Sequence, residues 1–415
     1  MLRPDYEMKI LDNGISILHK QVEHTKITHC GFILDIGSRD ERPEQQGLAH
    51  FWEHMAFKGT KKRKAYHILN RIDSVGGELN AYTTKEKMCF YASLLSTHFE
   101  KALELLSDIT FNSVFPEHQI EKERNVILEE MALYEDNPED AIQDEFDHTI
   151  FPDHPLGNNI LGTRNSIRAF HKNDFELFIR RNLRCEGLIF SSVSDLPSKK
   201  VFELAAKYLA DLGPFAGVTD RRCAAEYVPR SRILKKPIGQ CQCAIGRTAF
   251  SLQDPRRLPA LFLSNLLGGP AMNSRLNLSL REQHGLVYNI ECSYSPFSDT
   301  GLFGIYFGTE KRNLHRSVDL VLRELKKLRE KPLSSLQMHR AIEQFIGQMA
   351  MAEENNISLM LMMGKSMLDL GRIDSFEAVT KQVRELKPGD LLDLARDLLA
   401  EEQLSFLYFI PQNKD

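Results

Sequence analysis

Apolar and polar residues alternate along the first half of the chain in patterns that distinguish strands from helices. Residues 8–20 alternate on both sides of Asn13-Gly14, a dipeptide that favours a tight turn, and so predict a β-hairpin. Similar runs predict strands at 30–36, 79–83 and 88–94. Apolar residues at helical spacing predict helices at 46–57, 66–75, 98–112 and 116–134. The charged, proline-containing segment 135–139 is expected to be a loop.

The second half of the chain repeats this order of elements. Strands are predicted at 242–250 and 304–308, and helices at 257–267, 314–329 and 334–352. The strands at Gly31 and Cys243 are 212 positions apart, and those at Tyr91 and Gly304 are 213 apart. Two unrelated domains could share this order by accident, but the matched offsets favour an internal duplication.

The repeated order predicts an α+β fold of two similar halves, each a β-sheet packed with helices. The first domain is expected over residues 1–212 and the second over 241–415. Between them, 213–240 is rich in proline, glycine and charged residues, as a linker would be.

Composition excludes several classes of function. The 415 residues include 53 basic and 57 acidic ones, a net charge of −4, so a nucleic-acid partner has no electrostatic basis. The most apolar stretches, such as 359–363, are far shorter than the roughly 18 residues of a membrane span. The first residues lack the apolar core of a signal peptide and are too acidic for a transit peptide. With seven irregularly spaced cysteines, these features lead us to expect a cytoplasmic protein.

The segment Gly47-Leu-Ala-His-Phe-Trp-Glu-His-Met-Ala-Phe57 carries the strongest chemical signal. On a helix, His50 and His54 lie one turn apart on the same face and can hold one metal ion together. Zinc binds neutral imidazoles and keeps a position open for water, whose proton Glu53 could take. The order His-x-x-Glu-His is typical of inverzincins. The alternative is a helix with two packed or capping histidines and an exposed glutamate.

A zinc site of this kind requires a third protein ligand. In the predicted helix 116–134, Glu123 and Glu130 lie on an otherwise apolar face, where a buried carboxylate is costly unless a cation pairs with it. Glu129 lies about 100° away on a more polar face. We therefore predict Glu130 as the ligand and Glu123 as the residue that supports the ligands from behind. Solvated acidic side chains that only oppose nearby basic ones are the alternative.

Taken together, these motifs resemble the insulinase/pitrilysin family of zinc peptidases, in particular its mitochondrial processing peptidase-like and bacterial zinc-protease branch. The resemblance extends over essentially the whole chain. It rests on the segments 47–60, 76–83, 123–131, 154–157, 160–163 and 280–288. The family's spacing of its glutamates points to Glu130 and Glu123, the same carboxylates that the helical pattern favours.

The resemblance implies a metalloendopeptidase that hydrolyses peptide bonds of unfolded peptides or small polypeptides, with one zinc ion per chain. It implies that two such chains, or one double-length chain, close like a clamshell around an extended peptide. In such proteins the strand that carries Asn80 and Ala81 pairs with the substrate backbone. Arg281 and Tyr288, from the second half, are implied to reach the substrate carbonyl.

The resemblance also implies partners besides the peptide substrate. Relatives assemble as homodimers or as heterodimers with a related subunit, so one of these assemblies is expected. Some relatives are noncatalytic assembly subunits, and a zinc-binding structural protein is a third reading. Intact His50, Glu53, His54 and Glu130 count against the noncatalytic role, and a purely structural zinc site would leave Glu53 without a task.

Overall fold

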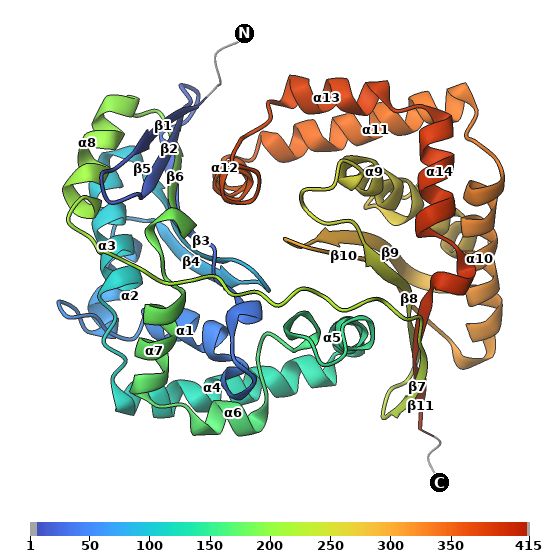
Figure 1. The fold of residues 1–415 in the computed structure, drawn as a ribbon, viewed down its shortest axis with the longest axis horizontal. Coiled ribbons are helices and arrows are strands. Elements are labelled where there is room, and N and C mark those ends of the chain that lie inside the picture. The colour runs from blue at the N-terminus through green and yellow to red at the C-terminus, as the bar shows by residue number, and fades with distance from the viewer. Residues whose placement is uncertain (1–5, 413–415) are drawn as a thin grey trace. The chain divides into compact units, whose positions relative to one another are not determined.

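The computed structural model describes residues 6–412 and folds into two compact units (Figure 1). Residues 1–5, on which the expectation of no signal segment partly rests, lie outside the described range. The first unit comprises the chain up to Met131, then Asn158–Arg221 and Met351–Ser375. The second comprises Ala132–Gly157, Arg222–Ala350 and the chain from Phe376 onwards. Each unit therefore draws on both halves of the sequence.

The first unit is built on a mixed sheet with the strand order β1-β2-β6-β3-β5-β4. The strands are β1 (Glu7–Ile10), β2 (Ser16–Gln21), β3 (Ile27–Leu34), β4 (Glu78–Thr83), β5 (Met88–Leu95) and β6 (Leu188–Ser194). The predicted hairpin forms, because β1 and β2 pair antiparallel on either side of Asn13-Gly14. β6 is parallel to β2 and antiparallel to β3, β5 is antiparallel to β3, and β4 pairs antiparallel with β5 and ends the sheet.

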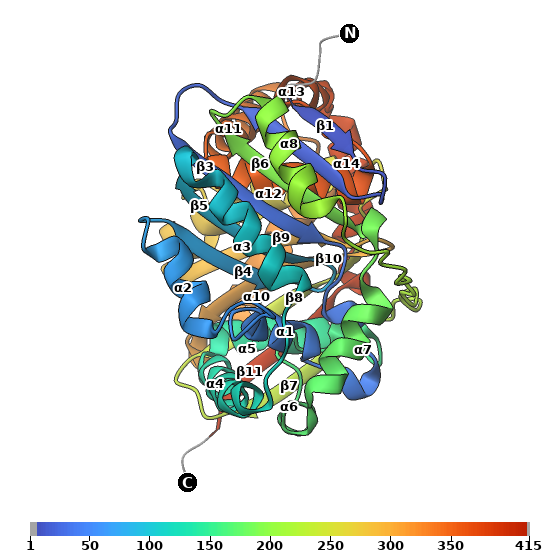
Figure 2. The ribbon, with the colours of Figure 1, turned by 90° about the vertical axis from the view of Figure 1, so that its left-hand side faces the viewer.

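Helices cover both faces of this first sheet. They are α1 (Leu48–Ala56), α2 (Ala65–Asp73), α3 (Phe99–Phe111), most of α4 (Glu117–Asp136), α6 (Arg164–Ala169), α7 (Lys172–Asn182), α8 (Ser198–Leu209) and α12 (Asn356–Leu370). Figure 2 views the unit from the side of α3 and α8. Phe32 and Leu34 of β3 join the core formed with α1 and α3, while Ile33 between them joins a second cluster with α12. This alternation follows from the two-residue period of a strand.

The second unit is built on a five-stranded sheet with the order β7-β11-β8-β10-β9. The strands are β7 (Ser231–Lys236), β8 (Cys241–Ala249), β9 (Val287–Pro296), β10 (Gly301–Thr309) and β11 (Ser405–Pro411). Its helices are α5 (Pro138–Ile150), α9 (Arg257–Gly268), α10 (Leu314–Glu330), most of α11 (Ser335–Glu353), α13 (Phe376–Glu385) and α14 (Pro388–Leu398). Ile245 of β8 joins the core formed with α9 and α10, and Ala244 joins a separate cluster with α5.

The two sheets share one topology, so the predicted fold of two similar halves is confirmed. Reading across from β2, the first sheet has one parallel pairing followed by three antiparallel ones, and so does the second sheet from β7. The halves also exchange a helix: α5 contacts β8, β10 and β11 of the second sheet, and α12 contacts β3 and β6 of the first. The division of the sequence at 212 and 240 stays a prediction.

One local prediction is wrong. Segment 135–139 is not a loop, because α4 continues to Asp136 and α5 begins at Pro138. Proline is tolerated at the first helical position, where its missing N–H would have no partner in the helix. The Asn137 side chain accepts a hydrogen bond from the Glu139 backbone at 3.2 Å and so caps α5. Within residues 6–412, the helices are all too short or too polar to cross a membrane.

Candidate metal centre

Helix α1 presents one apolar face to the core and one polar face away from it. Its large, fully buried side chains follow the i, i+3, i+4, i+7 spacing of an amphipathic helix and are Leu48, Phe51, Trp52 and Met55. The helix starts after Gly47, whose φ of 92° and close approach to the carbonyl oxygen of Leu161 exclude a side chain. His50, Glu53 and His54 occupy the remaining face; His50 is buried and the other two are half-buried.

Helix α4 supplies the carboxylates. Glu123 and Glu130 lie seven residues apart, and between them the helix is buried at Arg124 and Ile127. The Arg124 guanidinium fixes the helix by donating hydrogen bonds to the backbone carbonyls of residues 167 and 170, at 3.0 and 2.7 Å. Glu123 is buried, Glu130 is half-buried and Glu129 is exposed. The structure therefore turns Glu123 and Glu130, and not Glu129, towards the protein.

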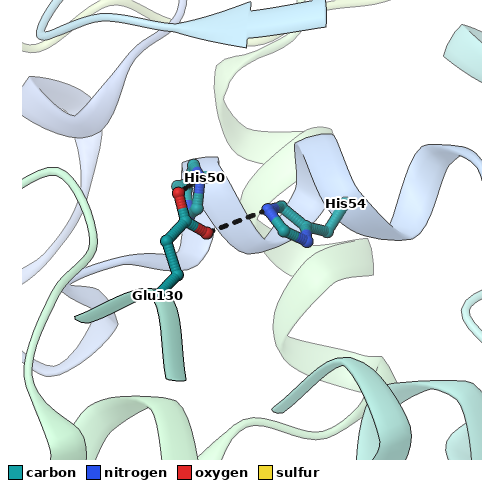
Figure 3. A group of neighbouring side chains, drawn as sticks. All are labelled: His50, His54 and Glu130. Carbon is teal, nitrogen blue, oxygen red and sulfur yellow. Dashed lines mark ion pairs between the residues drawn. The ribbon is translucent and has the colours of Figure 1, made fainter. Parts of the chain in front are cut away.

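Two imidazoles and one carboxylate converge at this site (Figure 3). Glu130 Oε1 lies 3.7 Å from His50 Nε2, and Glu130 Oε2 lies 3.4 Å from His54 Nε2. One potential ligand atom from each residue falls within 4.8 Å of the others. Donors on a tetrahedral zinc ion lie about 3.3 Å apart, given zinc–donor distances of about 2.0–2.2 Å. The three side chains thus fit a zinc ion with small adjustments.

The surrounding hydrogen bonds agree with this fit. The second nitrogen of His54, Nδ1, lies 3.2 Å from Glu123 Oε2, which leaves Nε2 for a metal, as is usual for metal-binding histidines. Lys58, one turn after His54, places its Nζ 2.6 Å from the other Glu123 oxygen. The Nδ1 atom of His50 is buried and has no hydrogen-bond partner among residues 6–412, so this imidazole lacks the supporting hydrogen bond that His54 has. The sequence pattern did not single out Lys58.

The three potential ligands shift one another's pKa values. Burial, and then the neighbouring His54, lower the pKa of His50 to about 4. Burial alone would lower the pKa of His54, but hydrogen bonds with Glu123 and Glu130 outweigh it and raise this pKa to about 9. The hydrogen bond with His54 lowers the pKa of Glu130. A raised pKa means that metal binding at His54 would compete with proton binding.

Glu53 lies apart from the three potential ligands and has its own partner. The hydroxyl of Thr83, at the end of β4, donates a hydrogen bond of 2.7 Å to Glu53 Oε2. Burial raises the pKa of the Glu53 carboxyl, and the Thr83 bond opposes that rise. Thr83 was not among the residues predicted from the sequence. Its only signal was its position in the segment 76–83, next to Asn80 and Ala81.

Asn80 and Ala81 lie on the same strand as Thr83. Within the described range 6–412, β4 pairs only with β5 and forms the edge of the sheet, with Asn80 opposite Tyr91 in the register. Asn80 is exposed and Ala81 is half-buried. An edge strand has a row of backbone N–H and C=O groups that another extended chain can pair with. The roles predicted for Asn80 and Ala81 stay predictions.

In the second unit, the structure brings Arg281 and Tyr288 together. Arg281 lies in a short π-helical segment, Asn277–Glu282, and its guanidinium carbon is 5.8 Å from the centre of the Tyr288 ring on β9. Between them, Gly285 has a φ of 59°, in the left-handed region that favours glycine, so the chain can turn there. Tyr288 is 86% exposed, so its hydroxyl is available to a ligand. A role in catalysis stays a prediction for both.

Comparison with known proteins places the sequence in one family. Residues 16–164 match the model described as insulinase (peptidase family M16), and residues 169–345 match the model described as peptidase M16 inactive domain. The chain is 31% identical over 404 residues to an uncharacterized zinc protease of Rickettsia bellii, covering 97% of each. It is 27% identical to the beta subunit of the mitochondrial-processing peptidase of Saccharomyces cerevisiae, covering 96% of this chain and 89% of that protein.

A solved structure has the same fold. The structure from Pseudomonas fluorescens, described as a peptidase M16 inactive domain, has a TM-score of 0.91 and 17% identity and covers 98% of each chain. The His50, His54 and Glu130 group lies within the first family match, and Arg281 and Tyr288 lie within the second. Both family models and the relatives that match almost end to end therefore confirm the resemblance read from the motifs: this chain belongs to the insulinase (peptidase M16) family.

Proposed function

We propose that this protein is a zinc-dependent endopeptidase that hydrolyses peptide bonds in unfolded peptides or small polypeptides. The proposal rests on the different surroundings of the polar side chains on α1. His50 and His54 meet Glu130 in a three-donor group, while Glu53, between them in sequence, has a separate hydrogen-bond partner. A structural zinc site has no need of that fourth, separately held group.

His50, His54 and Glu130 would hold one zinc ion per chain. When bound, zinc supplies Lewis acidity, which polarises a peptide carbonyl and makes a neighbouring water more acidic. Glu53 accepts the proton of the water that attacks the carbonyl carbon, and it returns this proton to the amine that leaves. Because burial raises the pKa of Glu53, its carboxylate is a better proton acceptor than an exposed one.

The substrate would bind as an extended chain. The free edge of β4 at Asn80 and Ala81 offers backbone groups for strand pairing, which only an unfolded segment can use. Arg281 and Tyr288 carry hydrogen-bond donors suited to the carbonyl oxygen of the bond being cut. The exposed Tyr288 side chain and the Arg281 guanidinium, 5.8 Å from its ring centre, support such a role.

The assembly is part of the proposal. The yeast relative is named as one subunit of a processing peptidase, and we propose that this chain likewise works as a homodimer or as a heterodimer with a related subunit. A noncatalytic subunit is the alternative, but the donor group and the hydrogen-bonded Glu53 favour the catalytic role. A cytoplasmic location completes the proposal.

The test measures zinc content and hydrolysis together. Purified protein is analysed for bound metal and incubated with a peptide library whose products are identified by mass spectrometry. We expect one zinc ion per chain and internal cleavages that stop after chelation and return with zinc. Glu53→Gln should keep the zinc and lose activity by about 10²- to 10⁴-fold, the usual contribution of general acid–base catalysis. Full activity of the zinc-loaded Glu53→Gln protein would refute the assignment of the base.

A further inference from the structure

The hydroxyl of Thr83 has an unusual position, because it donates to the one carboxylate at the site that is not a potential metal ligand. The Glu53 oxygen Oε2 accepts this hydrogen bond at 2.7 Å. Among residues 6–412, Thr83 is the only hydrogen-bond partner of the Glu53 side chain. We infer that Thr83 is a positioning residue, which fixes the Glu53 carboxylate for proton transfer. This inference rests on the proposed function and names a residue that acts through the base.

The chemistry of the two groups makes the direction of the bond unambiguous. An ionised carboxylate can only accept, and a threonine hydroxyl has a single proton to donate. The bond therefore engages Oε2 and leaves Oε1 of Glu53 as the oxygen that can exchange a proton with water. A hydroxyl is also uncharged, so it can hold the carboxylate without taking over the role of the base.

Thr83 can hold Glu53 only if it is itself held in place. As a β-branched residue it has a restricted χ1, and its backbone pairs with Met88 in the β4–β5 ladder. The turn that follows is closed by the Thr84 hydroxyl and backbone, both of which bond to the backbone of Lys87.

Ion pairs attach this turn to other elements of the first unit. The Lys87 ammonium is buried between two carboxylates, at 2.9 Å from Asp35 after β3 and at 2.7 Å from Asp369 on α12. Removal of one partner of such a buried ion pair is costly, so the pairs fix the end of the hairpin. The hydroxyl of Thr83 is therefore presented from a rigid support, which is what the positioning of a base requires.

The competing explanation is that Thr83 only fills space between β4 and α1. Thr83→Val separates the two explanations, because valine has the same shape and β-branching but no hydroxyl. Thr83→Ser does the reverse: it removes the methyl group and keeps the donor. Thr28→Val is the matched control, since Thr28 is fully buried on β3, donates to Ser96 at 3.0 Å and lies at the other end of the β3–β5 ladder, opposite Leu94.

The experiment measures kcat, KM and zinc content of the full-length zinc-loaded protein and these variants on one quenched fluorescent peptide that the wild type cleaves. We expect Thr83→Val to lower kcat by about 10- to 100-fold with KM and zinc content unchanged, because misplacement of a catalytic group by about 1 Å costs about that much. Thr83→Ser should recover most of the rate, and Thr28→Val should match the wild type. In a Glu53→Gln background, Thr83→Val should cost nothing further, because the residue acts through the base.

Several results would overturn the inference. Wild-type kcat in Thr83→Val would show that the hydroxyl is dispensable, and a serine variant as slow as the valine variant would assign the effect to packing. Loss of zinc from Thr83→Val would place the effect on the metal ligands instead. High-resolution crystal structures of the wild type and Thr83→Val give a readout without activity: an unchanged Glu53 conformation would refute positioning even if the protein proved not to be a peptidase. Failure of the proposed function is separate, since it would appear as wild type and Glu53→Gln with equal activity.

Discussion

Replacement of Glu130 by glutamine is a direct test of the metal centre, because its neighbour Glu129 provides a control of the same chemistry. Glutamine keeps the size and shape of glutamate and removes only the charge. The Glu130 carboxylate bridges the two imidazoles, with one oxygen 3.7 Å from His50 and the other 3.4 Å from His54. Glu129 is exposed and belongs to no potential metal group among residues 6–412.

Comparison with Glu123 sets a lower bound on the loss of zinc affinity in Glu130→Gln. Groups that support a metal ligand from behind, as Glu123 supports His54 at 3.2 Å, typically change metal affinity by about 10- to 100-fold when altered. Glu130 is itself a donor and the only negatively charged one of the three, so its loss should exceed that range. We expect Glu130→Gln to weaken zinc binding by at least about 100-fold, or about 2.8 kcal/mol. Glu129→Gln should stay within about twofold, as for a surface substitution.

The assay is competition with a chromophoric zinc chelator at fixed pH and ionic strength. Zinc dissociation constants are measured for the wild type, Glu130→Gln and Glu129→Gln. Circular dichroism of the chelated proteins establishes that all three are folded before zinc is added. Equal affinities in Glu130→Gln and the wild type would show that the third ligand lies elsewhere. Equal losses in both variants would show that general charge near the site, and not coordination, governs the affinity.

Three further predictions concern the second unit, the exchanged helix and pH. Arg281→Ala and Tyr288→Phe should each lower kcat/KM for a peptide by about 10- to 1,000-fold with zinc content unchanged; full activity in both would confine catalysis to the first unit. Phe146→Ala on α5 should destabilise the second unit by about 3–5 kcal/mol in calorimetry, because this side chain is fully buried, whereas exposed Leu133→Ala should be nearly neutral. His19 is buried, and burial lowers its pKa below 6.5. The folded protein therefore binds a proton at His19 more weakly than the unfolded chain does, so the free energy of unfolding should fall as the pH drops below 6.5. His19→Asn should reduce this slope in urea unfolding at pH 7.5 and 5.5, and an unchanged slope would contradict the assignment.

Much of the site could be predicted from the sequence because it depends on helical periodicity. The spacing of His50, Glu53 and His54 places them on one face of any helix, and the apolar residues around Glu130 distinguish it from Glu129. The partners from other elements could not be predicted in this way. The hydrogen bond from Thr83 to Glu53 joins a strand end to a helix 30 residues away and depends on the side-chain conformations of both residues. No periodic pattern encodes such a contact.

The local elements and the two similar halves could be predicted from the sequence, but the pairing of strands within each sheet could not. Parallel pairings such as β2 with β6 join residues more than 170 positions apart. The apolar–polar alternation of a strand does not indicate which other strand it pairs with. The start of α5 was missed because the charged, proline-containing segment 135–139 was expected to be a loop, although Asn137-Pro138 can cap and start a helix. The exchange of α5 and α12 leaves no local signal, since either helix could bury its apolar face on either sheet.

Equivalent helices in the two halves share a place in the fold but carry different side chains. α1 follows β3 in the first half and α9 follows β8 in the second, so the two helices occupy the same place in equivalent topologies. α1 carries His50, Glu53 and His54, whereas α9 reads Arg-Leu-Pro-Ala-Leu-Phe-Leu-Ser-Asn-Leu-Leu-Gly and has no histidine or carboxylate. A structure described as an inactive domain reaches a TM-score of 0.91 with this chain, so backbone similarity by itself does not distinguish a peptidase from a scaffold. The proposed function therefore depends on side chains of α1 and α4 and on the hydroxyl at the end of β4, and variants at those positions test it more sharply than any further comparison of folds.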